Sequence, residues 1–205
     1  MHSVTSAQAY DGSAIDGAVY VDVVDAAHHA PSWLDGLISG YSTYGLALFA
    51  FLMLIGWWQA RHQDAAQAVK ALAAPILTVL AFVVSTLLKQ AVQENRPCQS
   101  LHVITLEACP ATGDWSFPSN HATLAAAAAV ALWFVSTRLG VIATFGALAM
   151  AASRVWVGAH YPHDIAAGLA VGALVATLLA VPLFRHADAV AGVLGRGRLR
   201  SLVAG

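Results

Sequence analysis

The chain has 205 residues, of which 59% are hydrophobic and 10% are charged, with a formal net charge of −1. Soluble domains carry about 25% charged residues, so this composition excludes that class and indicates a polytopic membrane protein. The small net charge gives no sign of a nucleic-acid partner. We expect one domain over residues 1–205, folded as an all-α membrane helix bundle with a short N-terminal interfacial helix.

Residues 1–40 form the predicted outer N-terminal segment. Residues 1–27 are small, polar and acidic, without Lys or Arg. The first 17 residues lack the basic and apolar regions of a secretory signal peptide, so we expect insertion to depend on the first membrane span. Residues 28–40 place Trp33 among mixed polar and apolar positions. This pattern fits either a short interfacial helix anchored by Trp33 or an ordinary loop.

Five apolar stretches are long enough to cross a bilayer. They are residues 41–58, 71–88, 121–136, 139–157 and 164–184. The polar connection 90–120 is long for a compact bundle, and such connections commonly carry binding loops. Alanine and glycine are frequent in the last three spans, which allows close helix packing.

Lys and Arg are distributed unevenly among the segments that connect and flank these spans. Seven of the ten lie in the link 59–70, the turn 136–140 and the basic tail 185–205. By the positive-inside rule these segments face the cytoplasm. The N-terminus is then outside and the C-terminus inside, and five spans satisfy that parity. The three cations on the opposite face are Lys89, Arg96 and Arg154.

Ionisable residues gather at the predicted outer ends of the spans, where charge is costly and functional roles are common. His160 and Asp164 are four residues apart, so on a helix they share a face. A carboxylate placed there can hold one imidazole nitrogen and leave the other free to attack. His121, at the start of the third span, can donate a proton to a leaving oxygen. Taken singly, each residue is also explained as a helix cap or a loop histidine.

The same face offers a binding site for an anion. Lys89, Arg96 and Arg154 together neutralise a group with two or three negative charges, and arginine forks match the paired oxygens of a phosphate. Ser119 is a favourable helix N-cap. The free backbone amides that follow it form an anion cradle at a helix N-terminus.

A three-part pattern spans residues 89 to 164. It reads Lys89-(six residues)-Arg96-Pro97, then Pro118-Ser119-Asn120-His121, then Ser153-Arg154-(five residues)-His160-(three residues)-Asp164. This pattern resembles the signature of the type-2 phosphatidic acid phosphatase superfamily. The resemblance implies that His160 is the nucleophile and forms a phosphohistidine, with Asp164 as its partner and His121 as the general acid. It implies that Lys89, Arg96, Ser119 and Arg154 hold the phosphoryl oxygens, and that no metal or cofactor is required.

One position departs from that pattern, because Asn120 stands where the family usually has glycine. Its backbone amide remains and its side chain adds a donor facing the phosphate, so we expect activity to survive. The wider sequence is similar to the bacitracin-resistance type of undecaprenyl pyrophosphate phosphatase. The shared features include Glu94 just before Arg96-Pro97, the run 116–119, and the run 154–158.

Four further residues are candidates outside this pattern. Glu94 and His163 are possible substrate contacts, although a lone loop histidine is more often neither a substrate contact nor a metal ligand. Cys98 and Cys109 both lie in the outer loop. An outward-facing loop is in an oxidising compartment, so they form either a disulfide or two free thiols.

The sequence thus predicts a lipid phosphatase of the bacterial cytoplasmic (inner) membrane, active at its extracytoplasmic face. The expected substrate is a polyprenyl diphosphate, cleaved to the monophosphate for reuse of the carrier in cell-wall synthesis. One alternative is a phosphatase of phosphatidate, phosphatidylglycerol phosphate or another lipid phosphate. Another is a non-catalytic lipid-binding or transport protein. A vanadate-dependent oxidase is disfavoured because those proteins resemble soluble domains. The oligomeric state is not indicated.

Overall fold

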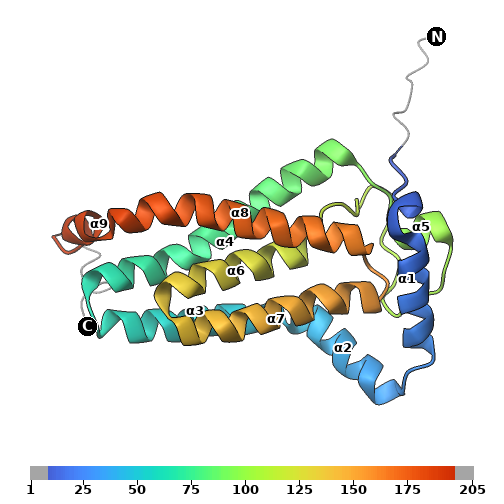
Figure 1. The fold of residues 1–205 in the computed structure, drawn as a ribbon, viewed down its shortest axis with the longest axis horizontal. Helices are drawn as coiled ribbons and strands as arrows, with labels where there is room; N and C mark the ends of the chain where they lie inside the picture. The colour runs from blue at the N-terminus through green and yellow to red at the C-terminus, as the bar shows by residue number, and fades with distance from the viewer. Residues whose placement is uncertain (1–8, 197–205) are drawn as a thin grey trace, which may run out of the picture.

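The computed structural model describes residues 9–196, and this part of the chain is almost entirely helical. The long helices run roughly along one direction, and α1 (Ser13–His28) crosses the end of the bundle that they form (Figure 1). The predicted all-α bundle is therefore confirmed. The helices are α1 Ser13–His28, α2 Ser32–Tyr44, α3 Leu46–Arg61, α4 Ala65–Val92, α5 Pro97–Leu101, α6 Asn120–Val135, α7 Thr137–Trp156, α8 Pro162–Arg185 and α9 Ala187–Leu194.

The apolar stretches predicted as spans correspond to α3, α4, α6, α7 and α8. Helices α4, α7 and α8 are long and apolar enough to cross a membrane. Helices α2 and α3 form a fourth candidate span as a pair, bent by 56°. The first predicted span, 41–58, is therefore interrupted, and the break falls at Gly45, where a β-carbon would collide with the Tyr41 carbonyl and with Met150. The chain is a multi-pass membrane protein.

Helix α6 lies at the centre of the bundle, in contact with α3, α4, α7 and α8. It is apolar but shorter than the spans, and its alanines 125–129 are buried. Helix α8 approaches it closely because Gly168 and Gly172 lack a side chain. A β-carbon at these positions would collide with the backbone carbonyls of Ser119 and Thr123. This small-residue packing brings the beginning of α8 next to the beginning of α6.

The N-terminal segment is more structured than the sequence analysis expected. Helix α1 occupies most of a stretch that was considered only polar and acidic. Tyr20, Val24 and Ala27 recur at helical spacing and are buried. Tyr20 and Val24 belong to a cluster that includes Tyr161 at the start of α8. The apolar face of α1 therefore packs on the end of the bundle, which its acidic residues concealed in the sequence. In the region 28–40, the chain is helical from Ser32 onward, and this helix, α2, continues to Tyr44.

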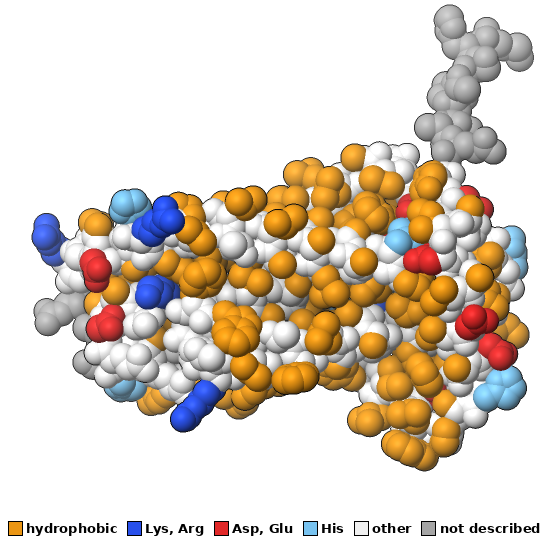
Figure 2. Space-filling model, in the orientation of Figure 1, with side chains coloured by type: hydrophobic (Ala, Val, Ile, Leu, Met, Phe, Trp, Pro, Cys, Tyr) orange, Lys and Arg blue, Asp and Glu red, His pale blue; other side chains and the backbone are white. Residues whose placement is uncertain are grey.

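The two ends of the molecule carry different charges. Lys and Arg side chains gather at the end near α9, whereas acidic and His side chains predominate at the end near α1 (Figure 2). The predicted basic tail includes the short helix α9. Its residues Arg198 and Arg200 lie outside the described part of the chain.

Candidate active site

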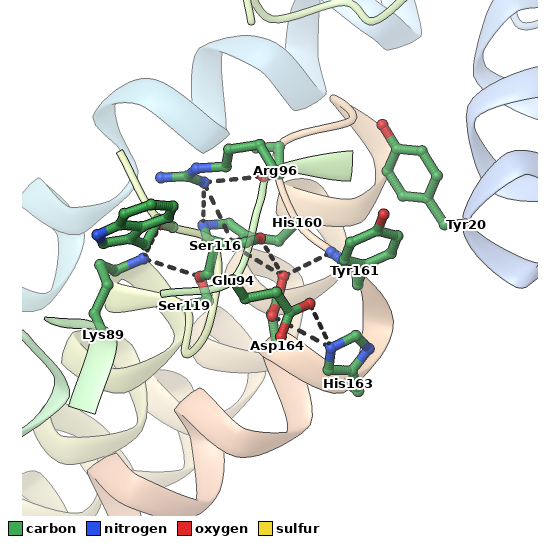
Figure 3. A network of polar contacts seen from close by, with 12 residues as sticks. Tyr20, Lys89, Glu94, Arg96, Ser116, Ser119, His160, Tyr161, His163 and Asp164 are labelled. Carbon is green, nitrogen blue, oxygen red and sulfur yellow. Dashed lines mark hydrogen bonds and ion pairs between the residues drawn. The ribbon is translucent and has the colours of Figure 1, made fainter. Parts of the chain in front are cut away.

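Most of the predicted catalytic and anion-binding residues lie close together, and Figure 3 shows Lys89, Arg96, Ser119, His160 and Asp164 among them. Six of them are at most 7% exposed. Buried charges in proteins are nearly always paired or functional, so a group of them needs a chemical reason. They are Lys89 from the last turn of α4, Arg96 before α5, Ser119 before α6, Arg154 near the end of α7, His160 between α7 and α8, and Asp164 in the first turn of α8.

The His160 imidazole is held between a carboxylate and a guanidinium. Its Nδ1 lies 3.3 Å from Asp164 Oδ2, which also accepts hydrogen bonds from Ser116 Oγ at 2.5 Å and the Tyr161 amide at 2.9 Å. Its Nε2 lies 2.9 Å from Arg96 Nη1. Because Asp164 accepts the Nδ1 proton, Nε2 keeps its lone pair and accepts from Arg96.

Electrostatics keep this imidazole neutral. Burial lowers the pKa of His160 well below its ordinary value, and the positive charges of Arg96, Lys89 and Arg154 lower it further. A neutral imidazole with a free Nε2 lone pair, surrounded by cations, can attack an electrophilic centre that carries negative charge.

Lys89 and Arg96 are fixed by the loop that precedes α6. Lys89 Nζ donates to the carbonyls of Trp115 and Ser116 at 2.5 and 2.9 Å. Arg96 donates through Nε to the Asp114 carbonyl at 3.0 Å and through Nη2 to Asp114 Oδ1 at 2.8 Å. Both cations are therefore positioned by backbone carbonyls as well as by charge.

Arg154 approaches the site from α7. Its Nη1 donates to Ser42 Oγ at 2.5 Å and to Glu107 Oε2 at 2.8 Å. Ser42 belongs to α2, so the bent first span also reaches the site. Sequence reasoning missed Ser42, although a polar residue inside an apolar stretch is a signal of this kind of contact.

Two of the predicted phosphate-binding residues have a buried donor without a hydrogen-bond partner among the described residues. These donors are Arg154 Nε and Ser119 Oγ. Ser119 does occupy the N-cap position of α6, but its hydroxyl makes no capping hydrogen bond. His121 lies in the first turn of α6, directly after Asn120. Unpaired buried donors are costly, so these groups fit a site that binds an acceptor-rich anion.

Asn120 connects two helices. Its Oδ1 accepts a hydrogen bond from Ser85 Oγ of α4 at 2.7 Å, and Thr123 Oγ1 donates to Ser85 Oγ at 3.2 Å. From the sequence, this side chain was expected to donate to the phosphate. The structure shows that its oxygen points to α4, and this bond holds α4 against the beginning of α6.

Glu94 and His163, the possible substrate contacts, bind each other. His163 Nε2 lies 2.9 Å from Glu94 Oε1, and His163 Nδ1 lies 2.7 Å from Asp16 Oδ1. Sequence reasoning missed Asp16 because α1 was not expected. It also missed Ser116, although that residue adjoins the second motif. Ser116 donates to Asp164, and Asp16 binds His163 beside it. Neither residue belongs to the three-part pattern.

Cys98 and Cys109 form a disulfide in the structure. The bridge joins α5, which directly follows Arg96, to the loop that carries Glu107. It therefore restrains the loop whose carboxylates, Glu107 and Asp114, pair with Arg154 and Arg96.

Comparisons with known proteins agree with this geometry. The model of the PAP2 superfamily matches residues 70–186. The chain is 31% identical to "Undecaprenyl-diphosphatase BcrC" of Bacillus subtilis over 160 residues, which is 78% of either chain. It is 38% identical over 112 residues to "Lipid A 1-phosphatase" of Rhizobium johnstonii, covering 52% of this chain and 45% of that protein.

A further relative is "Decaprenylphosphoryl-5-phosphoribose phosphatase" of Mycobacterium tuberculosis, 34% identical over 59% of this chain and 60% of that protein. The fold is similar to the crystal structure of a transmembrane PAP2 type phosphatidylglycerolphosphate phosphatase from Bacillus subtilis. The TM-score is 0.59, with 19% identity and coverage of 85% and 86% of the two chains. Since the family model covers more than half of the chain, the protein belongs to the PAP2 superfamily, and it is a membrane-embedded lipid phosphatase.

Proposed function

We propose that this phosphatase converts a polyprenyl diphosphate to the monophosphate and inorganic phosphate. One observation carries the proposed chemistry: the buried His160 ring has Nδ1 beside Asp164 and Nε2 beside Arg96, and burial and the nearby cations lower its pKa. The substrate class is supported by the relative named undecaprenyl-diphosphatase, which matches over most of its length.

The reaction proceeds by two displacements at the terminal phosphorus. His160 Nε2 attacks phosphorus, and the bond to the bridging oxygen breaks as His121, which the negative charge of the bound diphosphate keeps protonated, donates a proton to the departing polyprenyl phosphate. His121 then takes a proton from water, which attacks the phosphohistidine and releases phosphate with return of His160 Nε2. Throughout, Nδ1–H stays on Asp164, which fixes the ring and stabilises the charge that develops on it.

The rate gain comes from positive charge that is already in place. Charge on the transferring phosphoryl group spreads over its peripheral oxygens, so fixed cations stabilise the transition state. Arg96 now donates to Nε2, and we propose that it moves to a phosphoryl oxygen when substrate enters. Arg154 Nε and Ser119 Oγ, which have no partner among the described residues, supply further donors.

We place the site at the outer face of the cytoplasmic membrane of a bacterium, with the N-terminus outside and the C-terminus inside. The segregation of Lys and Arg toward the α9 end supports this orientation, because the site lies at the other end (Figure 2). The product would then be available on the side where the lipid carrier delivers its cargo.

A second candidate is a phosphatase of a different lipid phosphate. Relatives named for lipid A 1-phosphatase and decaprenylphosphoryl-5-phosphoribose phosphatase activities match 52% and 59% of this chain. The residues around His160 recognise a phosphoryl group and leave the lipid undetermined.

The deciding experiment measures phosphate release by the full chain in detergent, with a metal chelator present. Undecaprenyl diphosphate and phosphatidate are compared, with His160→Ala as the blank and His29→Ala, an exposed histidine on the same end, as the matched control. Rapid release from the diphosphate alone supports the proposal. Equal or faster release from phosphatidate moves the assignment to a general lipid phosphatase, and release that survives in His160→Ala removes His160 as the nucleophile.

A further inference from the structure

The two oxygens of the Asp164 carboxylate have different surroundings. Oδ2 faces His160, Ser116 and the Tyr161 amide. Oδ1 is buried and makes no hydrogen bond among the described residues, but it lies 3.6 Å from His163 Nε2. The carboxylate is therefore bonded on the His160 side and has a histidine on its other side (Figure 3).

His163 is surrounded by carboxylates. Its Nδ1 is 2.7 Å from Asp16 Oδ1, its Nε2 is 2.9 Å from Glu94 Oε1, and its backbone amide donates to Asp16 Oδ2 at 2.7 Å. An ionised carboxylate only accepts hydrogen bonds, so both ring nitrogens donate and the ring carries both protons. His163 is therefore an imidazolium, and its positive charge lies between Asp16, Glu94 and Asp164.

The ring is also fixed by packing. It stacks on Tyr161 with a centroid separation of 5.3 Å and an interplanar angle of 16°, and it lies 6.1 Å from the Phe117 ring at 28°. Phe117 directly follows Ser116, which donates to Asp164. The aromatic contacts therefore join the histidine to the same loop that holds the carboxylate.

The N-terminal segment closes over this cluster. Tyr10 pairs with the chain beside Glu94, through Tyr10 N to the Gln93 carbonyl at 3.1 Å and Asn95 N to the Tyr10 carbonyl at 2.9 Å. Gly12 then passes so close that a β-carbon would collide with the Glu94 carboxylate and the His163 ring. Segment 10–16 thus fits closely around the Glu94 and His163 side chains, outside the region matched by the family model.

We propose that His163 is a positioning residue for catalysis, an imidazolium held by Asp16 and Glu94 that keeps Asp164 ionised and its Oδ2 directed at His160. The reason is electrostatic. Glu94 and Asp164 are both fully buried, and two neighbouring buried carboxylates do not both stay ionised without a cation. With His163 charged, Asp164 remains the acceptor of the His160 Nδ1 proton. This inference rests on the roles proposed above for His160 and Asp164.

The ionisable groups around this pair come from several elements. They are Asp16 from α1, Lys89 from α4, Glu94 from the segment after α4, and His160 and Tyr161 from the loop before α8. Arg96 acts on Asp164 through His160. Lys89 and Arg96 approach from the side of the nucleophile, so only His163 offers a cation to the Asp164 side that faces Glu94, within the described part of the chain.

The test compares His163→Gln with the wild-type enzyme in phosphate release as a function of substrate concentration and pH. We expect kcat to fall about ten- to a hundredfold, the size found for outer partners that orient a catalytic group. KM should change by less than about twofold, since the phosphate-binding cations are untouched. Without the imidazolium, Asp164 is protonated more easily, so the acid limb of kcat should move to higher pH and raising the pH should restore part of the loss.

Asp16→Asn provides a second variant that leaves the active-site residues intact. It weakens the ion pair between α1 and the His163 imidazolium. We expect kcat to fall about two- to fivefold, with the same shift of the acid limb and the same small change in KM. His29→Asn is the matched control, because His29 pairs with Asp25 four residues earlier on the exposed surface. Should His163→Gln fail to fold, Asp16→Asn decides, because a wild-type kcat and pH profile for it would overturn the proposal.

Three other outcomes also overturn it. A rise in KM with kcat retained would make His163 a substrate contact. An equal loss at every pH would make it a structural residue only. The donors of Glu94, His163 and Asp164 also lie close enough together to hold a metal ion. Loss of wild-type activity in EDTA with recovery in Zn²⁺ would show that a metal, rather than the imidazolium, organises the cluster. Release by the wild type but not by His160→Ala shows separately that the proposed function stands.

Discussion

The two sides of His160 are built differently. On the side of the phosphate-binding cations, Arg96 and Arg154 pair with Asp114 and Glu107, whose side chains are 52% and 44% exposed. On the other side, Asp164 is completely buried. Ser116, which donates a hydrogen bond to Asp164, and the neighbouring Glu94 are buried as well. We call the side of Asp114 and Glu107 the solvent side, and the buried side of Asp164 the sealed side.

This difference indicates what each side can do. Ion pairs near solvent are weak and exchange readily, so the carboxylates of Asp114 and Glu107 can give way to phosphoryl oxygens. Hydrogen bonds in a buried polar network are costly to break and hold one geometry. The sealed side therefore sets the tautomer and direction of His160, and the solvent side exchanges its anions.

The largest effect is expected from Asp164→Asn on the sealed side. An amide at this position can donate to Nδ1, which moves the imidazole proton to Nε2 and removes the attacking lone pair. We expect kcat to fall about a thousandfold or more, as for loss of the orienting carboxylate in comparable triads. Single-turnover phosphate release measures this loss, and thermal unfolding in detergent checks that the variant folds. Retention of more than a tenth of the wild-type rate would show that Asp164 does not set the tautomer.

The pH profile tests the same side with an effect of about tenfold. A histidine with the ordinary pKa of about 6.5 would be about 90% protonated at pH 5.5 and would lose about tenfold in activity. Because burial lowers the pKa of His160, its neutral form persists there, and we expect its contribution to the acid limb of kcat/KM to lie below pH 6.5. Titration of the His160 ring at or above pH 6.5, followed by NMR, would contradict the neutral, buried nucleophile, and it separates His160 from Asp164, which also contributes to the acid limb.

Stability should respond to the same depressed pKa. The unfolded chain binds a proton at His160 near pH 6.5, whereas the folded chain does not. As the pH falls below 6.5, the unfolded state therefore gains protons and the free energy of unfolding decreases. The contribution of His160 to stability is complete above that pH and declines toward the folded-state pKa. Unfolding in urea at pH 7.5 and pH 5.5, for wild type and His160→Gln, measures this slope.

Much of the bundle and the core of the site could be predicted from the sequence. Long apolar stretches have few solutions in a membrane, so the helices follow from composition and length. The spacing of four residues between His160 and Asp164 similarly indicated that the two side chains lie together. The structure places them 3.3 Å apart.

The rest depends on tertiary packing that no local pattern reports. Asp16 reaches His163 across 147 residues, and Ser42 reaches Arg154 across 112. Helix α1 was missed because its three aspartates are interspersed among its apolar positions, such as the buried Tyr20. The exchangeable partners of the arginines, Asp114 and Glu107, lie in an irregular loop that the disulfide restrains. The sequence of this loop has no periodic pattern from which its path could be predicted.

The smallest effect is expected on the solvent side, from Asp114→Asn and Glu107→Gln. Each variant releases an arginine from an exposed carboxylate that competes with phosphate for the guanidinium. Such pairs contribute about 0.2–1 kcal/mol, which corresponds to at most about a fivefold change in affinity. We therefore expect inhibition by inorganic phosphate to tighten up to about fivefold in each variant, with kcat changed less.

The control and the salt dependence make this prediction specific. Asp25→Asn removes the same charge from the exposed surface of α1 without releasing an arginine, so its phosphate inhibition should match the wild type. Raising the ionic strength should reduce the gain in Asp114→Asn, since salt screens exposed charges. If phosphate inhibition were unchanged or weaker in both loop variants, Asp114 and Glu107 would be fixed supports of the arginines. The solvent side would then be as rigid as the sealed side, and entry of the substrate would require another source of mobility than exchange of these anions.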